Sequence, residues 1–155
     1  MRILDYISAE TVMVSSLSGT KEESIRALTA LLAAAGKIPD AQALEAAILR
    51  REQAVSTALG EGVAIPHAKL EGISSPSVAL GLCKEGVPYD APDGKPVRIL
   101  FLIASCLKDD GTQLKILAAL ARYIKTPGFV NQLQSSQTPQ DVLGVFSQFE
   151  AMVRL

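Results

Sequence analysis

The stretch from residue 50 to residue 69, RREQAVSTALGEGVAIPHAK, decides how the rest of the chain is interpreted. It contains Gly60 and Gly62, and glycines permit a close backbone approach and positive φ angles. Pro66 then fixes the backbone directly before His67 and keeps the preceding residue extended. The pattern predicts a rigid loop that presents an imidazole at a defined angle.

His67 is the only histidine in the sequence. Metal sites with two histidine ligands are therefore excluded within one chain, and we expect neither a metal nor a cofactor. A neutral imidazole carries a lone pair, so it can attack a phosphoryl group without a general base. Such transfers depend mostly on positioning and charge stabilisation. The alternative is that His67 is a surface or loop-packing histidine.

Several neighbours of His67 carry groups that could hold a phosphoryl group. The guanidinium of Arg51 could clamp phosphate oxygens in bidentate fashion, or it could be a solvated charge at a helix end. Ser56 and Thr57 offer hydroxyl donors, or they are ordinary turn residues. Lys69 would point to the same side as His67 on an extended chain, or it is a plain surface lysine.

Composition sets the broad class of the protein. The 155 residues are 48% hydrophobic and 20% charged, which predicts one globular domain over residues 1–155. Fifteen basic against sixteen acidic side chains give no electrostatic signature of nucleic-acid binding. The longest apolar stretch, Ile99–Leu107, is about half of a bilayer span, so we expect no membrane insertion.

Two cysteines, Cys83 and Cys106, lie in apolar runs and fit no metal-ligand spacing. Free thiols of this kind are typical of a reducing compartment, which favours a cytoplasmic location.

Apolar periodicity and capping residues predict an α/β fold, with a small sheet sandwiched by helices. Thr20 and Glu23 form a capping-box signature at the first helix. In the helix over 113–124, we expect Leu114, Leu117, Ala121 and Ile124 to face inward. We expect helices over 21–35, 41–52, 113–124, 127–135 and 139–153, and strands over 12–17, 77–83 and 97–105.

The central stretch resembles the phosphorylation-site motif of type-2 enzyme IIA domains of the bacterial phosphotransferase system. This is the fructose/mannitol/nitrogen class. The positions that carry the resemblance are Arg51, Glu52, Ser56, Thr57, Gly60, Gly62, Ala64, Ile65, Pro66 and His67.

The resemblance implies a mixed sheet of about five strands flanked by helices. It implies that His67 accepts a phosphoryl group from an HPr-like phosphocarrier protein. Arg51 would stabilise the phosphoryl charge, and the segment Ser56–Thr57 would line the pocket. A stand-alone domain resembles the nitrogen-type branch more. In that branch, the output would be the regulation of protein targets. The alternative is a sugar-specific component that passes the phosphoryl group to a cysteine of a IIB domain.

Gln113 departs from the family pattern, which has a second histidine at this position. An amide can donate a hydrogen bond to a phosphoryl oxygen, but it does not become a cation. Gln113 is therefore expected to bind the phosphoryl group as a neutral donor. A further alternative is a regulatory binding module without phosphoryl chemistry. The presence of both Arg51 and His67 argues against this alternative.

Overall fold

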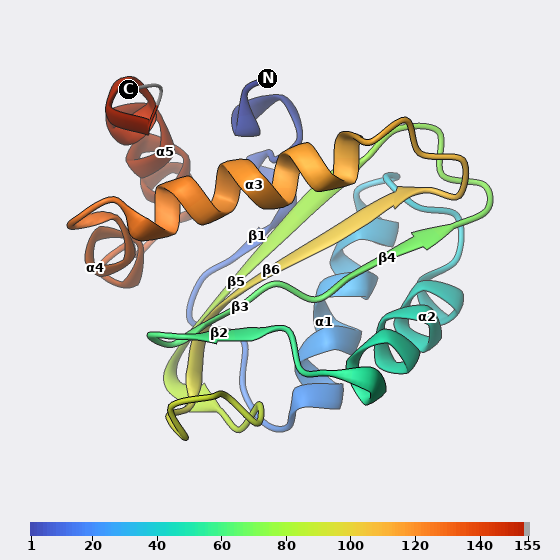
Figure 1. Ribbon diagram of the computed structural model, residues 1–155, viewed down its shortest axis with the longest axis horizontal. Helices are drawn as coiled ribbons and strands as arrows, with labels where there is room; N and C mark the ends of the chain where they lie inside the picture. Colours follow the sequence, from blue (N-terminus) through green and yellow to red (C-terminus); the bar gives the residue numbers. More distant parts are fainter. Residues whose placement is uncertain (154–155) are drawn as a thin grey trace.

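The computed structural model describes residues 1–153 and shows a central sheet with helices on both faces (Figure 1). The helices α1 and α2 cover one face, and α3, α4 and α5 cover the other. The helices are α1 (Lys21–Ala34), α2 (Ala41–Ala54), α3 (Thr112–Lys125), α4 (Phe129–Gln134) and α5 (Pro139–Val153), with short 3₁₀ turns at Ile3–Asp5 and Ala9–Thr11.

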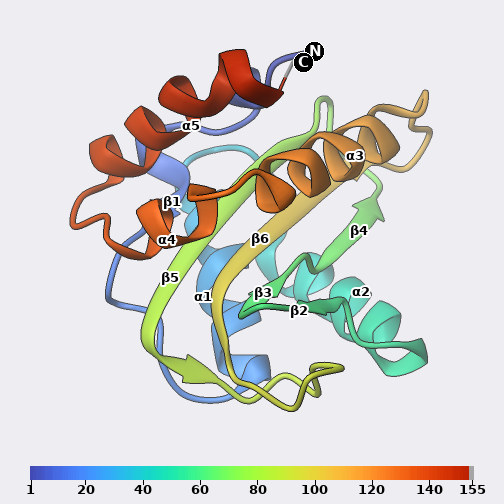
Figure 2. The same cartoon turned by 60° about the vertical axis from the view of Figure 1, so that its left-hand side comes forward.

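The sheet is mixed, and its two long strands run antiparallel through the middle (Figure 2). The strand order is β1-β5-β6-β3-β2, and β4 also pairs with β6. The strands are β1 (Val12–Met13), β2 (Ala58–Gly60), β3 (Val63–Ala64), β4 (His67–Leu70), β5 (Ser77–Val87) and β6 (Val97–Cys106).

The predicted α/β sandwich is confirmed, with six strands in place of about five. The strands that apolar periodicity did not predict are β2, β3 and β4, and all three come from the central stretch. Glycine and proline divide that stretch into pieces of two to four residues, which are too short to show a strand period. Both β3 and β4 pair in parallel with β6, so the central strand aligns the whole motif.

Two cores form because side chains of the long strands alternate between the faces of the sheet. On β6, Phe101 and Ile103 pack with α3 and α5, whereas Leu100 and Leu102 pack with α1 and α2. These four side chains are fully buried, which makes β6 the rigid support of the structure.

Two expectations about local structure were wrong. The strand predicted over 12–17 ends at Met13, because Ser15 has a φ of 64° and a left-handed residue does not continue a strand. The predicted inward face of α3 was wrong at Leu114, which is 71% exposed. Leu117 and Ile124 are partly buried and do pack against the core. Lys115 and Arg122 share the exposed face of this helix with Leu114, so the spacing of apolar residues alone did not assign Leu114 to its face.

Within residues 1–153, none of the helices combines the length and the apolar character that a membrane crossing requires.

Candidate functional site

His67 is the first residue of β4 and lies directly beside the central strand. Its Cα pairs with that of Ile103 on β6, and the backbone N–H of Ile103 donates to the carbonyl of Pro66 over 3.0 Å. The backbone on both sides of the imidazole is therefore held by the core. The side chain is half-buried, so the ring is fixed and still reachable.

A hydrogen bond fixes which nitrogen of His67 carries the proton. Nδ1 lies 2.7 Å from the backbone carbonyl oxygen of Ile65. A carbonyl only accepts hydrogen bonds, so Nδ1 must be the donor in this contact. In the neutral ring the lone pair is then on Nε2, which is the nucleophilic atom that the site presents.

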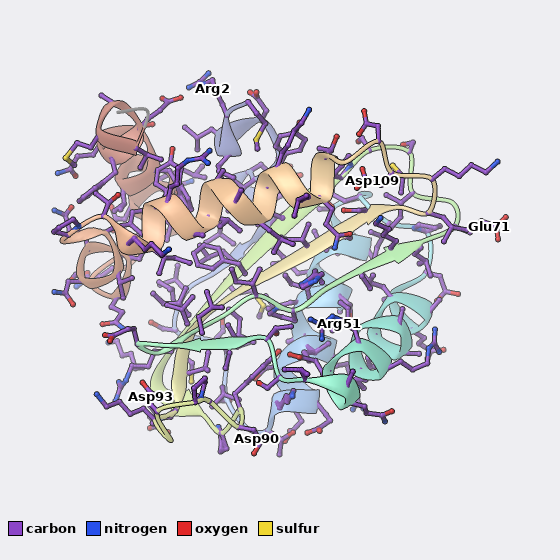
Figure 3. The ribbon with its side chains drawn as sticks, in the orientation of Figure 1. Arg2, Arg51, Glu71, Asp90, Asp93 and Asp109 are labelled. Atoms are coloured by element: carbon purple, nitrogen blue, oxygen red, sulfur yellow. The ribbon has the colours of Figure 1, made fainter. Side chains whose placement is uncertain are left out.

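Arg51 lies in the last turn of α2, the helix that packs against β4 (Figure 3). Its Nη1 donates to the carbonyl of Val55 over 2.9 Å, beyond the end of the helix. The contact uses one of the five guanidinium N–H groups, and the side chain is exposed. The remaining donors are available to an anion.

The hydroxyls of Ser56 and Thr57 form hydrogen bonds within the protein. Ser56 Oγ donates to the carbonyl of Tyr89 over 2.8 Å and accepts from the N–H of Ala58 over 3.2 Å. Thr57 is buried, and its hydroxyl donates to Glu52 over 2.5 Å. These bonds hold the segment before β2 in one conformation.

Glu52 is the shared acceptor of a buried hydrogen-bond network, and this role was not predicted from the sequence. Its side chain accepts hydrogen bonds from the Thr57 N–H at 2.9 Å and from the Tyr89 hydroxyl at 2.5 Å, in addition to the Thr57 hydroxyl. Lys21 Nζ lies 3.9 Å from the same carboxylate. A buried carboxylate of this kind fixes its donors, because each would be costly to leave unpaired.

Tyr89 connects this network to the loop between β5 and β6. Burial, together with the hydrogen bond to Glu52, raises the pKa of Tyr89 well above its ordinary value, so the phenol remains a donor. Lys21 Nζ lies 4.4 Å from the centroid of its ring, in cation–π geometry. Three segments, α1, α2 and the loop between β5 and β6, thus hold the turn that follows α2.

Gln113 lies in the first turn of α3 and is 8% exposed. Among the described residues its Oε1 has no hydrogen-bond partner. Its backbone N–H donates to Asp109 Oδ2 over 3.0 Å, and that of Thr112 donates to Asp109 Oδ1 over 3.1 Å. Asp109 therefore caps α3, and the unpaired buried atom at this helix start is the side-chain oxygen of Gln113.

Lys69 links the strand of His67 to the start of α3. Lys69 Nζ lies 4.0 Å from Asp109 Oδ2, and Asp109 follows the end of β6 (Figure 3). The site thus joins β4 and α3 through one ion pair. Asp109 carries a recognisable sequence signal, an acidic residue just before a helix, whereas its contact with Lys69 does not follow from the sequence.

Residues 5–149 match the family model described as phosphoenolpyruvate-dependent sugar phosphotransferase system, EIIA 2. This chain belongs to that family. An EIIA relative from Haloferax volcanii, the PTS system fructose-specific EIIA component, is 37% identical over 137 residues, which cover 86% of this chain and 89% of the relative.

Two further comparisons widen the range of EIIA relatives. The PTS system fructose-specific EIIABC component of Bacillus subtilis is 33% identical over 97% of this chain, which spans only 24% of that protein. The crystal structure of nitrogen regulatory protein IIA-Ntr from Neisseria meningitidis superposes with a TM-score of 0.85 at 25% identity, covering 92% of this chain and 97% of that one. Sugar-specific and nitrogen-regulatory EIIA proteins are thus both similar to this chain.

Proposed function

We propose that this EIIA chain is a phosphocarrier in which Nε2 of His67 accepts a phosphoryl group from an HPr-like protein. The observation that carries the proposal is the hydrogen bond from Nδ1 to the carbonyl of Ile65. It leaves the lone pair on Nε2 of a ring that β6 holds in place. Membership of the family supports the same chemistry.

In the proposed transfer, the Nε2 lone pair attacks the phosphorus of a phosphohistidine on the donor protein. The donor P–N bond breaks, and its electron pair returns to the donor imidazole. The His67 ring becomes a phosphorylated imidazolium that keeps its Nδ1 proton. The carbonyl of Ile65 then faces a cationic ring, and this charge-assisted hydrogen bond is stronger than the one in the neutral ring.

The other site residues have positioning and charge-stabilising roles in this proposal. Arg51 contacts the phosphoryl oxygens with its free guanidinium donors, and Gln113 donates from its side-chain amide. Ser56 and Thr57 line the pocket as a segment that Glu52 and Tyr89 hold rigid.

We also propose that residues 1–155 form one EIIA domain and that the protein acts in the cytoplasm. The family model spans nearly the whole chain, and helices from both halves pack on one sheet. Cys83 and Cys106 are free thiols, which supports a reducing compartment.

The downstream partner is either a regulatory protein or a IIB domain. Structural similarity to the nitrogen regulatory protein supports the regulatory output. The 33–37% identity to fructose-specific relatives supports transfer to a IIB cysteine. Transfer to a IIB cysteine can be tested directly by offering a purified IIB domain to the phosphorylated chain and following loss of the label.

Labelling tests the proposed function. The chain is incubated with phosphoenolpyruvate, enzyme I and an HPr-type carrier, and its intact mass is measured. We expect one phosphoryl group per chain, labile in acid and stable in base, as a phosphoramidate is. The variant His67→Ala should take up none. An acid-stable adduct, or undiminished labelling of His67→Ala, would contradict the proposal.

Running the same assay with a sugar-type carrier and with a nitrogen-type carrier separates the two outputs. Faster labelling by the nitrogen-type carrier favours the regulatory branch, and faster labelling by the sugar-type carrier favours transport.

The substitution Gln113→His should add a titrating group at the start of α3 to the transfer reaction. An imidazole titrates near neutral pH, whereas an amide does not titrate. We expect the rate of phospho-His67 formation or its half-life to change over about pH 5.5–8.5, with folding intact. Superimposable pH profiles for the two proteins would show that residue 113 does not reach the phosphoryl group.

A further inference from the structure

The loop between β5 and β6 contacts the central stretch on both sides of β2. Before β2, Tyr89 accepts a hydrogen bond at its backbone carbonyl from Ser56 Oγ over 2.8 Å and donates from its hydroxyl to Glu52 over 2.5 Å. After β2, Asp93 Oδ2 accepts from the N–H of Glu61 over 3.0 Å. A loop that is distant from the motif in the sequence therefore holds part of the motif in space.

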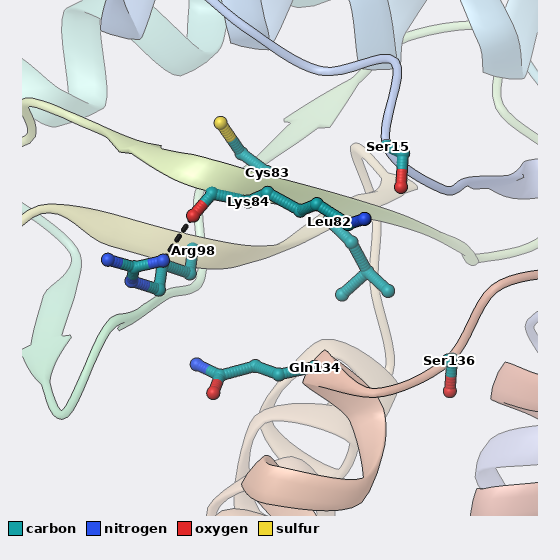
Figure 4. A pocket seen from close by; sticks show the side chains of 7 residues that line it. All are labelled: Ser15, Leu82, Cys83, Lys84, Arg98, Gln134 and Ser136. Atoms are coloured by element: carbon teal, nitrogen blue, oxygen red, sulfur yellow. Dashed lines mark hydrogen bonds between the residues drawn. The ribbon is translucent and has the colours of Figure 1, made fainter.

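The base of this loop is fixed by the two long strands. Val87 and Val97, at the two ends of the loop, pair with each other. The guanidinium of Arg98 donates to the backbone carbonyl of Lys84, which ties the same two strands together (Figure 4). Tyr89 follows Val87 by two residues and is only 2% exposed. Its phenol is therefore held in place by a loop with a rigid base.

A series of hydrogen bonds leads from the Tyr89 hydroxyl to the imidazole of His67. The Tyr89 hydroxyl and the backbone N–H of Thr57, the latter at 2.9 Å, both donate to the Glu52 carboxylate. The backbone carbonyl of Thr57 accepts from the N–H of Ile65 over 3.2 Å. The carbonyl of Ile65 in turn accepts from Nδ1 of His67 over 2.7 Å. Each residue of the series is buried except His67, which is half-buried.

The segment that carries His67 is held at two edges. On one edge, Ala64 and His67 pair in parallel with the central strand β6. On the other edge, the bond from Ile65 to the carbonyl of Thr57 extends the antiparallel pairing of Ala58 with Ala64. Loss of this second contact would let the Ile65 carbonyl move away from Nδ1. The proton of the neutral imidazole could then also reside on Nε2, and Nε2 would lose its lone pair for attack.

The same contacts of Tyr89 act on the turn that holds Arg51. Val55, whose carbonyl accepts from Arg51 Nη1, lies two residues before Thr57. Ser56 lies between them and donates to the Tyr89 carbonyl. The positions of the proposed nucleophile and of the proposed phosphoryl-binding arginine therefore both depend on one tyrosine outside the motif.

We propose that Tyr89 is a positioning residue for phosphoryl transfer to His67. Through Glu52 and Thr57, its hydroxyl holds the Ile65 carbonyl that keeps the proton on Nδ1 and the lone pair on Nε2. The role requires no chemical step at Tyr89 itself. The inference rests on the proposed function, because the rate that Tyr89 affects is the rate of phosphoryl acceptance by His67.

The test compares the wild type with Tyr89→Phe, which removes the hydroxyl and keeps the ring. In the unphosphorylated protein with ¹⁵N-histidine, imidazole ¹⁵N shifts at about pH 8.5, where an ordinary histidine is neutral, report which nitrogen carries the proton. We expect the proton on Nδ1 in the wild type and a mixture with the Nε2-protonated form in Tyr89→Phe. Single-turnover transfer from a phosphorylated HPr-type carrier should be about tenfold slower or more, since small misplacements of reacting groups cost up to about 100-fold.

Two further variants make the result specific. Thr57→Val removes another hydroxyl that donates to the Glu52 carboxylate, so it should shift the tautomer in the same direction as Tyr89→Phe. Val142→Ala is the control for a general loss of stability, because Val142 is fully buried on α5, a helix that contributes no residue to the series. It should leave the tautomer and the transfer rate unchanged.

A wild-type tautomer or a wild-type transfer rate in Tyr89→Phe would overturn the inference, and so would the same changes in Val142→Ala. The proposed function is judged separately, because it fails if the wild type takes up no phosphoryl group, whatever its tautomer is. A labelled wild type together with an unaltered Tyr89→Phe rejects the positioning role alone.

Discussion

Replacing Glu52 with alanine should lower the free energy of unfolding by about 3–5 kcal/mol, the range for removing one partner of a buried charged group. The substitution leaves the N–H and hydroxyl of Thr57 and the hydroxyl of Tyr89 without their acceptor. It also removes the carboxylate 3.9 Å from Lys21 Nζ. Urea unfolding followed by circular dichroism measures the change.

Two other variants make this result specific. Tyr89→Phe removes one donor and should cost about 1.5–3 kcal/mol, the range for a hydrogen bond to a charged group. Glu45→Ala is the matched control, because Glu45 lies on the same helix in an ion pair with the exposed Arg26, and it should cost no more than about 1 kcal/mol. If Glu52→Ala were as mild as Glu45→Ala, Glu52 would not organise the turn after α2.

Arg51→Ala should slow phosphoryl acceptance while leaving the fold intact. Loss of a charge-assisted contact in the transition state costs about 1.5–3 kcal/mol, which corresponds to a rate lower by about 10- to 150-fold. The hydrogen bond that Arg51 donates to the carbonyl of Val55 is exposed and contributes little to stability. Single-turnover labelling by a phosphorylated carrier measures the rate.

Arg50→Ala provides the control for this measurement. Arg50 is the preceding residue on α2, is exposed and carries the same charge. A general effect of positive charge on carrier encounter would slow both variants alike. Equal rates for Arg50→Ala and Arg51→Ala would show that Arg51 is a solvated helix-end charge.

Features determined by neighbouring residues could be predicted from the sequence. Thr20 and Glu23 exchange the two hydrogen bonds of a capping box at 3.1 Å each, as their spacing indicates. The rigidity of the Pro66–His67 pair is also a local property, because the proline ring fixes the backbone. The helices and the two long strands followed from the same short-range patterns.

Contacts between distant residues could not be predicted in this way. Glu52 and Tyr89 are 37 residues apart, and nothing in the loop around Tyr89 signals a buried hydroxyl. The ion pair between Lys69 and Asp109 depends on the parallel pairing of β4 with β6. The contact of Nδ1 with the carbonyl of Ile65 depends on a side-chain rotamer, which a sequence does not specify.

The most direct test uses the fact that the chain has a single histidine. The protein is labelled with ¹⁵N-histidine and phosphorylated, and coupling between ³¹P and the imidazole nitrogens is measured by NMR. We expect phosphorus coupled to Nε2 of His67, with Nδ1 still protonated against the carbonyl of Ile65. Phosphorus coupled to Nδ1, or a phosphorylated protein without coupling to an imidazole nitrogen, would contradict the proposed chemistry.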